Sequence, residues 1–204
     1  MKPVYLIVLS FFILASCTKK SNEQAPREEI PGSVISQYEH DPDLQYVKVM
    51  GPNQRVNEEG DLYKGQRQGA WISYYDGVAV KDITSYKAGI KQGPYFSFSN
   101  TGEMKEKTWY ANNQLNGRYV KYQYRSIIEE KFYEHGKLNG TVKIYYPGNK
   151  IKESSVYVDG KIEGKARWYD QEGNVSIEST YDKGKLVEQK TGAEIIQEKK
   201  ALEN

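Results

Sequence analysis

The sequence has little of what catalytic and metal sites are built from. Its 204 residues include one cysteine, Cys17, and two histidines, His40 and His135. A single cysteine excludes an internal disulfide, and neither histidine has a second ligand residue at a spacing typical of zinc sites. The sequence contains no Gly-x-Ser-x-Gly motif, and no glycine loop is followed by Gly-Lys-Ser/Thr. We therefore expect a non-enzymatic protein with no metal site and no cofactor.

The chain also lacks an excess of one charge and a large apolar content. It has 29 Lys and Arg against 27 Asp and Glu, and 38% of its residues are hydrophobic. Because no basic stripe is visible, a nucleic-acid partner is not expected. Tyrosine is abundant instead, with 18 copies. A tyrosine covers surface with its ring while its hydroxyl stays in water, which suits a thin sheet with little dry core.

One long apolar run is present, at residues 4–14, between Lys2 and the small residues Ala15 and Ser16. As a helix it would span about 16 Å, roughly half the hydrocarbon thickness of a bilayer, so it favours a removable signal over a membrane span. One interpretation is an ordinary secretory signal near which Cys17 stands by chance.

The segment Leu14-Ala15-Ser16-Cys17 resembles the lipobox of bacterial lipoproteins. The resemblance implies that residues 1–16 are a signal peptide and that Cys17 receives acyl chains, such as palmitate, on its sulfur and its new amino group. Several acyl chains anchor a protein stably. Thr18 stands where an aspartate commonly directs retention in the inner membrane, so we expect a cell-envelope protein on the outer membrane.

Residues 17–43 are polar and contain Pro26, Pro31 and Pro42. This composition predicts a flexible tether after the lipidated cysteine. Residues 44–62, around Gly51-Pro52-Asn53, predict an atypical first hairpin. Residues 191–204 begin with Thr191-x-x-Glu194, which has the spacing of a capping box, so a short helix there is expected to cover the last strand edge.

Residues 63–190 are periodic. Tyrosines recur every 23 or 24 residues, and a pair of glycines four residues apart follows most of them. Each copy contains two aromatic or β-branched runs separated by Gly or Asn, which predicts a β-hairpin. In the third copy Arg125-Ser126 replaces the glycine, so a distorted or longer turn is expected there. The recurring tyrosines are Tyr63, Tyr86, Tyr110, Tyr133, Tyr157 and Tyr181.

Two further positions recur. The fifth residue after the second glycine is always aromatic, and an acid stands four residues before the closing tyrosine in four copies. Since side chains alternate across a strand, each position predicts a ladder on one face. For the acids we expect solvated positions paired with lysines such as Lys81, Lys105 and Lys152. The aromatics are Tyr74, Phe98, Tyr122, Tyr145 and Tyr169, and the acids are Asp82, Glu106, Glu129 and Glu153.

The pattern Tyr-x-x-Gly-Lys-x-x-Gly-x-x-x-x-Tyr-Tyr-x-x-Gly, at Tyr133–Gly148, resembles the MORN repeat in its bacterial variant form. The resemblance covers about residues 63–190. It implies an all-β fold, an elongated single-layer antiparallel β-meander of five hairpin repeats and a closing half-repeat. We expect it to be nearly flat.

Large aromatic side chains are the candidate binding residues: Trp71, Trp109, Phe132 and Trp168. Filling space in a single-layer sheet is the alternative role for them. Trp109 and Phe132 occupy one repeat position at which the other copies carry smaller residues, Ser85, Val156 and Thr180. This variation is not what a requirement of the fold predicts.

These features favour a membrane-anchored protein-interaction module of the cell envelope, such as an accessory subunit of an outer-membrane assembly, whose partner is another envelope protein. Binding of peptidoglycan or another glycan by the aromatic face is the first alternative. An antitoxin-like or immunity role is the second, because similar repeat chains are often described as antitoxin-like.

Overall fold

The computed structural model describes residues 30–203 as one open antiparallel sheet followed by one helix. The expected all-β meander is confirmed: each main strand pairs with the next along the chain, and the short β8 and β11 extend β9 and β12 across a break. The strands are β1 (Ser33–Tyr38), β2 (Asp41–Met50), β3 (Val56–Tyr63), β4 (Gln66–Tyr75), β5 (Ala79–Lys87), β6 (Ile90–Phe98), β7 (Met104–Ala111), β8 (Gln114–Leu115), β9 (Gly117–Gln123), β10 (Ser126–Glu134), β11 (Lys137–Leu138), β12 (Gly140–Tyr145), β13 (Ile151–Val158), β14 (Lys161–Tyr169), β15 (Val175–Asp182) and β16 (Lys185–Thr191).

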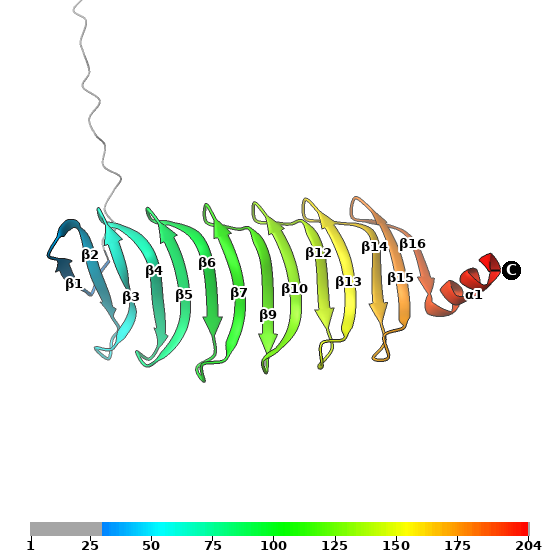
Figure 1. The fold of residues 1–204 in the computed structure, drawn as a ribbon, viewed down its shortest axis with the longest axis horizontal. Coiled ribbons are helices and arrows are strands. Elements are labelled where there is room, and N and C mark those ends of the chain that lie inside the picture. The colour runs from blue at the N-terminus through cyan, green and yellow to red at the C-terminus, as the bar shows by residue number, and fades with distance from the viewer. Residues whose placement is uncertain (1–29, 204) are drawn as a thin grey trace, which may run out of the picture.

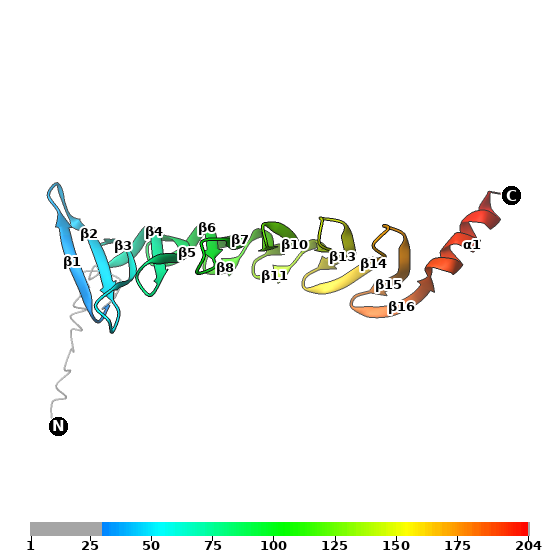
Figure 2. The same ribbon diagram turned by 90° about the horizontal axis from the view of Figure 1, so that it is seen from below.

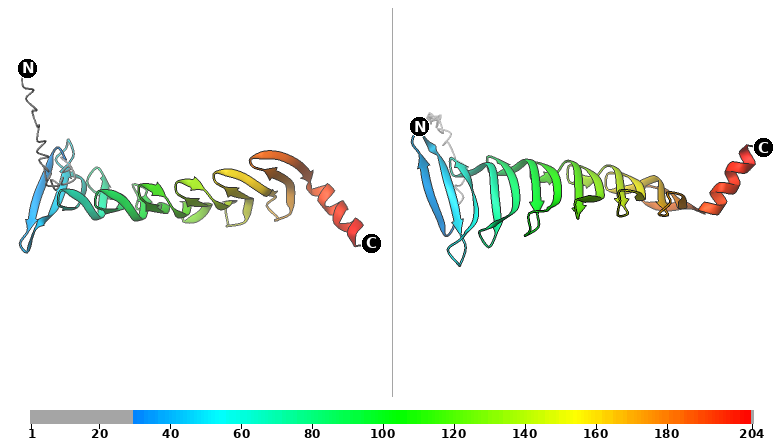
Figure 3. Two further views of the ribbon diagram at one scale, coloured as in Figure 1. Left: turned by 90° about the horizontal axis from the view of Figure 1, so that it is seen from above. Right: turned by 60° about the horizontal axis from the view of Figure 1, so that its bottom comes forward.

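The sheet is long in the direction perpendicular to its strands, with β1 at one end and β16 and the helix α1 (Gly192–Leu202) at the other (Figure 1). Views from below and above show that the hairpins are bowed and that the sheet twists along its length (Figures 2 and 3). No second layer covers either face in these views.

The sheet begins earlier than the sequence predicted. The expected flexible tether at residues 17–43 is wrong for its last part, because Ser33–Tyr38 and Asp41–Met50 form paired strands. Pro42 lies in β2, and Pro31 precedes β1 in a turn. The expected signal peptide, Cys17 and the rest of the tether lie outside the described residues.

The turns that join one repeat to the next are tight and left-handed. Each contains two successive residues with positive φ, such as His135 (φ 48°) and Gly136 (φ 78°). Two positive φ values define the type I′ turn, whose twist matches that of the strands. The first glycine of each predicted pair therefore lies in this turn. Asn113 (φ 64°) takes its place in the third copy, as expected from its tolerance of positive φ.

Each of these turns is also tied to the preceding repeat. The backbone N–H of Gly89 donates to the carbonyl of Arg67 at 2.9 Å, and Gly160 donates to Leu138 at 2.8 Å. Side chains reinforce the tie: the Gln68 Oε1 atom accepts from the N–H of Ala88 at 3.1 Å. Neighbouring repeats are thus joined by their turns as well as by their strands.

At the opposite ends of the hairpins, the turn of the third copy differs from the expectation. Tyr124 (φ 48°) and Arg125 (φ 64°) form a two-residue turn, and Gln123 pairs directly with Ser126. The prediction of a distorted or longer turn was therefore wrong. The chain tolerates two non-glycine residues at positive φ here, at a cost of roughly 1–2 kcal/mol for each, because the paired strands on either side fix the turn length.

Two irregularities recur in each repeat and bend its strands. Beside each fifth-position aromatic the register shifts by one residue, as between Ser73 and Tyr74, where Lys81 is the extra residue on the neighbouring strand. On the other side of the strand centre, the second glycine of each pair has positive φ, as at Gly93 (φ 112°). Bulges and such glycines bend strands. The expectation of a nearly flat sheet is therefore wrong.

The C-terminal helix is capped as the sequence predicts. The Thr191 side chain accepts from the backbone N–H of Glu194, and the Glu194 carboxylate accepts from the N–H of Thr191 at 2.7 Å, which completes the capping box. The helix buries no residue and leaves the end of the sheet (Figure 2). Six of the seven residues of β16 stay exposed, so the expected covering of the last strand edge is not what the helix does.

Candidate functional site

Most of the buried residues form a row across the strand centres, whereas Val120, which is 2% exposed, lies on the opposite face. Cross-strand pairs such as Trp71 with Thr84, Thr84 with Tyr95, Val142 with Ser155 and Ala166 with Ser179 connect them. Val47 and Ala166 are fully buried, and Ser155 and Ser179 are 1% and 2% exposed. In a single layer such burial requires a bent sheet, so we place this row on the concave face. The central row comprises Val47, Gly60, Trp71, Thr84, Tyr95, Thr108, Tyr119, Lys131, Val142, Ser155, Ala166 and Ser179.

Two residues further along each second strand, on the same face, stands the recurring tyrosine. Each of these tyrosines faces a glycine of the neighbouring strand: Tyr86 pairs with Gly69 and Tyr157 with Gly140. At the N-terminal end the equivalent position is Leu62, which is 3% exposed, whereas Tyr63 points away and is 41% exposed. The choice of Tyr63 as the first member was therefore wrong by one residue. The tyrosine row comprises Leu62, Tyr86, Tyr110, Tyr133, Tyr157 and Tyr181.

The recurring acids flank the central row on its other side, also on the concave face. They do not pair with the predicted lysines. The Asp82 carboxylate accepts from the Ser73 hydroxyl at 2.5 Å, and Glu106 accepts from the Tyr119 hydroxyl at 3.0 Å. Lys81 and Lys152 instead lie over the rings of Tyr75 and Tyr146. Lys81 and Lys152 are the extra residues of β-bulges, so their side chains do not follow the alternation between the two faces of the sheet on which the predicted pairing relied. The acid row comprises Glu58, Asp82, Glu106, Glu129 and Glu153.

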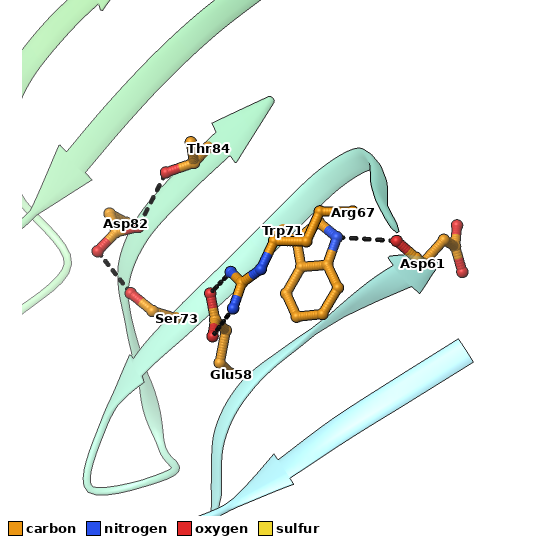
Figure 4. Close-up of polar contacts among 7 residues, drawn as sticks. All are labelled: Glu58, Asp61, Arg67, Trp71, Ser73, Asp82 and Thr84. Carbon is orange, nitrogen blue, oxygen red and sulfur yellow. Dashed lines mark hydrogen bonds and ion pairs between the residues drawn. The ribbon is translucent and has the colours of Figure 1, made fainter. Parts of the chain in front are cut away.

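These three rows define a trough that runs along the sheet. Figure 4 shows the polar contacts around Trp71 at the N-terminal end of the trough. The indole lies against Gly60, where an added Cβ would stand 2.6 Å from the ring, and its N–H donates to the carbonyl of Asp61 at 2.9 Å. The Arg67 guanidinium lies 4.0 Å from the ring centroid and pairs with Glu58. Trp71 is 1% exposed, so it is a core residue and not a contact for a ligand.

The middle of the trough differs chemically from its ends. Lys131 occupies the central-row position that carries threonine or serine in the other repeats, and its ammonium lies 2.7 Å from the Glu129 carboxylate. Burial acts to lower the pKa of Lys131, but the interaction with Glu129 outweighs it and raises that pKa. Lys131 is therefore the one charged residue of the central row as defined above, and it keeps its positive charge beside Glu129.

On either side of Lys131 a buried hydroxyl lacks a protein partner. The Thr108 Oγ1 and Ser155 Oγ atoms form no hydrogen bond, although their residues are only 4% and 1% exposed. A buried polar group without a partner costs roughly 1–3 kcal/mol. Both oxygens belong to the central row and lie beneath the surface of the trough, as the Trp71 indole does.

The opposite, convex face carries a second row across the sheet, which contains charged residues of both signs and four apolar residues, Ile72, Ile83, Phe96 and Val120. Glu130 pairs with Arg118, and Glu178 lies 2.7 Å from Lys165 and 2.6 Å from Arg167. The hydrogen bond from Lys165 lowers the pKa of Glu178 more than burial raises it. Beside this row, each fifth-position aromatic pairs with an aliphatic residue of the next strand: Tyr74 with Val80, Phe98 with Met104, Tyr122 with Ile127, Tyr145 with Ile151 and Tyr169 with Val175. The predicted aromatic ladder is therefore present as structural packing.

The structure divides the four predicted binding residues between the two faces. Trp71 and Trp168 lie on the concave face, and Trp168 fills the acid-row position between Glu153 and Ile177. Trp109 and Phe132 lie on the convex face, where they are 49% and 40% exposed. They form no single platform together. Sequence reasoning missed Lys131, because only its place in the central row distinguishes it from a solvated lysine.

Within residues 30–203, no three His, Cys, Asp or Glu side chains come together as a metal site. In the same part of the chain, no helix is both long and apolar enough to cross a bilayer.

Residues 138–159 and 162–183 match the family described as MORN repeat variant. No curated protein matches the chain. The matched segments are the last two hairpin repeats, from β11 to β15. The earlier repeats contribute residues at equivalent positions to the central, tyrosine and acid rows. The last two hairpin repeats are thus similar to the MORN repeat variant, and MORN repeats are in general modules for interaction with proteins or membranes.

The buried Trp71 and the half-exposed Trp109 should differ in how much their replacement by alanine lowers the free energy of unfolding. We expect Trp71→Ala to lower the free energy of unfolding by about 3–5 kcal/mol, because it leaves a cavity over Gly60 and removes the stacking partner of Arg67. Trp109→Ala, at a half-exposed position of the neighbouring repeat, should cost about 1 kcal/mol or less. Urea unfolding of both variants measures this. Equal losses would contradict the placement of Trp71 in the core.

The trough should also lose stability in alkali. Burial, together with Asp82 and Glu106, raises the pKa of Tyr95 from 10.0 to about 12. A raised pKa means that the neutral phenol stabilises the fold fully below pH 10, and that this contribution disappears between pH 10 and about 12. Tyr95→Phe should therefore reduce the loss of stability over this interval, followed by thermal melts at each pH. Tyr124→Phe, which changes an 82% exposed ring, is the control and should leave the loss unchanged.

Proposed function

We propose that this protein is a lipid-anchored, non-enzymatic interaction module of the bacterial cell envelope, held at the outer membrane through Cys17. The trough is the surface that binds its partner, an extended segment of another envelope protein, and the module serves as an accessory subunit of a membrane assembly. The observation that carries the proposal is the ion pair of Lys131 and Glu129 near the middle of the trough, whose side chains are 25% and 21% exposed and therefore within reach of a ligand.

The chemistry of the trough suits a polypeptide. Hydroxyl groups and the Lys131 ammonium can hydrogen-bond to peptide carbonyls, acids can accept from peptide N–H groups, and tyrosine rings can cover side chains between them. A segment that binds in this way would repeat its contacts at the spacing of the repeats.

The lipobox supports the anchor. We expect mass spectrometry of the purified protein to show a chain that begins at Cys17 and carries acyl groups, and Cys17→Ser to move the protein from the membrane to the soluble fraction. An unacylated wild-type chain that keeps residues 1–16 would refute the anchor and leave the trough untouched.

A matched pair of substitutions tests the trough. Ser155→Lys places a lysine where Lys131 already stands one repeat earlier, so the fold should accept it while the trough is filled. Val156→Lys changes the next residue, which is 41% exposed on the convex face. Crosslinking in intact envelopes should capture a partner protein with wild type and Val156→Lys, and at least tenfold less with Ser155→Lys. Equal capture by both variants, or no partner with wild type, would count against the proposal.

Glycan binding remains the second candidate because Trp109 and Phe132 are exposed at equivalent positions of adjacent repeats on the convex face. Aromatic rings at such positions are suitable for stacking on sugar rings. Sedimentation with purified peptidoglycan distinguishes the two: binding that is lost in Trp109→Ala and retained in Ser155→Lys favours the glycan.

A further inference from the structure

Within residues 30–203, no strand pairs with the outer edge of β1 at the N-terminal end of the sheet. The outer strand β1 (Ser33–Tyr38) reads Ser-Val-Ile-Ser-Gln-Tyr and contains no charge, proline or glycine. Its side chains from Val34 to Tyr38 are exposed, with Val34 at 56% and Ile35 at 53%. Soluble proteins protect such edges with lysine, proline, bulges or covering elements, because a free edge pairs readily with another strand.

The other end of the sheet is protected. Its last strand β16 (Lys185–Thr191) carries Lys185, Glu188 and Lys190, and Ser179 of the central row pairs with the polar Gln189. The contrast indicates that the edge of β16 is built to face solvent and that the edge of β1 is not.

The central row ends at the β1 edge, where the last member has no strand of the described residues on its outer side. Ile35 pairs with Val47, so it is the outermost member of the row, next to the fully buried Val47 and in line with Trp71. Every inner member of this row has a strand on both sides, whereas Ile35 has one on one side only. An additional strand beside β1 would bury Ile35 as the others are buried.

We propose that this additional strand is β1 of a second copy of the chain, paired antiparallel about a twofold axis at Ile35. Such an isologous contact sets the same residues against each other, and an uncharged strand meets its own copy without charge repulsion. The axis is perpendicular to the sheet, so both concave faces lie on one side and the two troughs join into one.

The anchor supports a second copy as the partner, and in this respect the inference rests on the proposed lipidation. Residues 18–32 separate Cys17 from β1 and can span at most about 50 Å. The twofold keeps corresponding surfaces on the same side, so both anchors can enter one membrane. One strand pair is a small contact, and attachment to a membrane raises the effective concentration of the copies for each other.

A cysteine crosslink tests the pairing in the intact, lipidated protein. Acylation blocks Cys17, so Ile35→Cys introduces a single free thiol where the two strands would face each other. Mild oxidation of membranes should convert most of the Ile35→Cys protein to a disulfide-linked dimer. Val187→Cys, at a 66% exposed position of β16, is the matched control and should stay monomeric, as should the wild type.

Each result decides between occupants of the edge. A dimer of Ile35→Cys that is lost when Val34→Lys and Ser36→Lys are added to the same chain, which sets lysine against lysine on either side of the twofold axis, supports the twofold pairing. Crosslinking between Ile35→Cys and Val187→Cys chains would instead show head-to-tail assembly and overturn it, as would a monomer throughout. A wild-type dimer through Cys17 would show that the anchor, and not the β1 pairing, had failed.

Discussion

A sheet without a second layer can bury side chains only by bending toward one of its own faces. Here the bending is supplied twice per repeat, by a one-residue bulge beside each fifth-position aromatic and by a positive-φ glycine opposite each tyrosine. Between these two points many side chains of the central row, including Val47, Trp71 and Ala166, are buried. The trough is therefore a consequence of the fold's only route to a core.

The same constraint explains why the core is so polar. A row one residue wide leaves room for few large side chains, so Thr84, Thr108, Ser155 and Ser179 fill it. Hydrogen bonds to acids satisfy part of this polarity, as from Thr84 to Asp82, while Thr108 and Ser155 stay unsatisfied. Stability then depends on the ties between neighbouring repeats, which is expected of repeat proteins whose units contact only their neighbours.

Much of this could be predicted from periodicity. The tyrosine and glycine spacing predicted the hairpins, their order and the tight turns, and Thr191 and Glu194 predicted the helix cap. The misplacement of Tyr63 arose because a leucine takes the first place in the tyrosine row, and spacing alone cannot separate two adjacent candidates. The lysine partners were wrong because bulges interrupt the alternation on which that prediction relied. Strand β1 was missed because its proline-flanked, polar surroundings resemble a linker, and only pairing with β2 makes it a strand.

The faces differ in what they offer to a partner. On the convex face most charges are already neutralised by neighbours, as Glu178 is by Lys165 and Arg167, so a ligand there would compete with existing pairs. On the concave face the hydroxyls of Thr108 and Ser155 are buried beneath the surface, whereas the Lys131 and Glu129 side chains are 25% and 21% exposed. This ion pair is therefore the charged group of the central and acid rows that a ligand in the trough would meet near its middle. At the β1 edge the central row itself reaches solvent, because Ile35 pairs with Val47 and is 53% exposed.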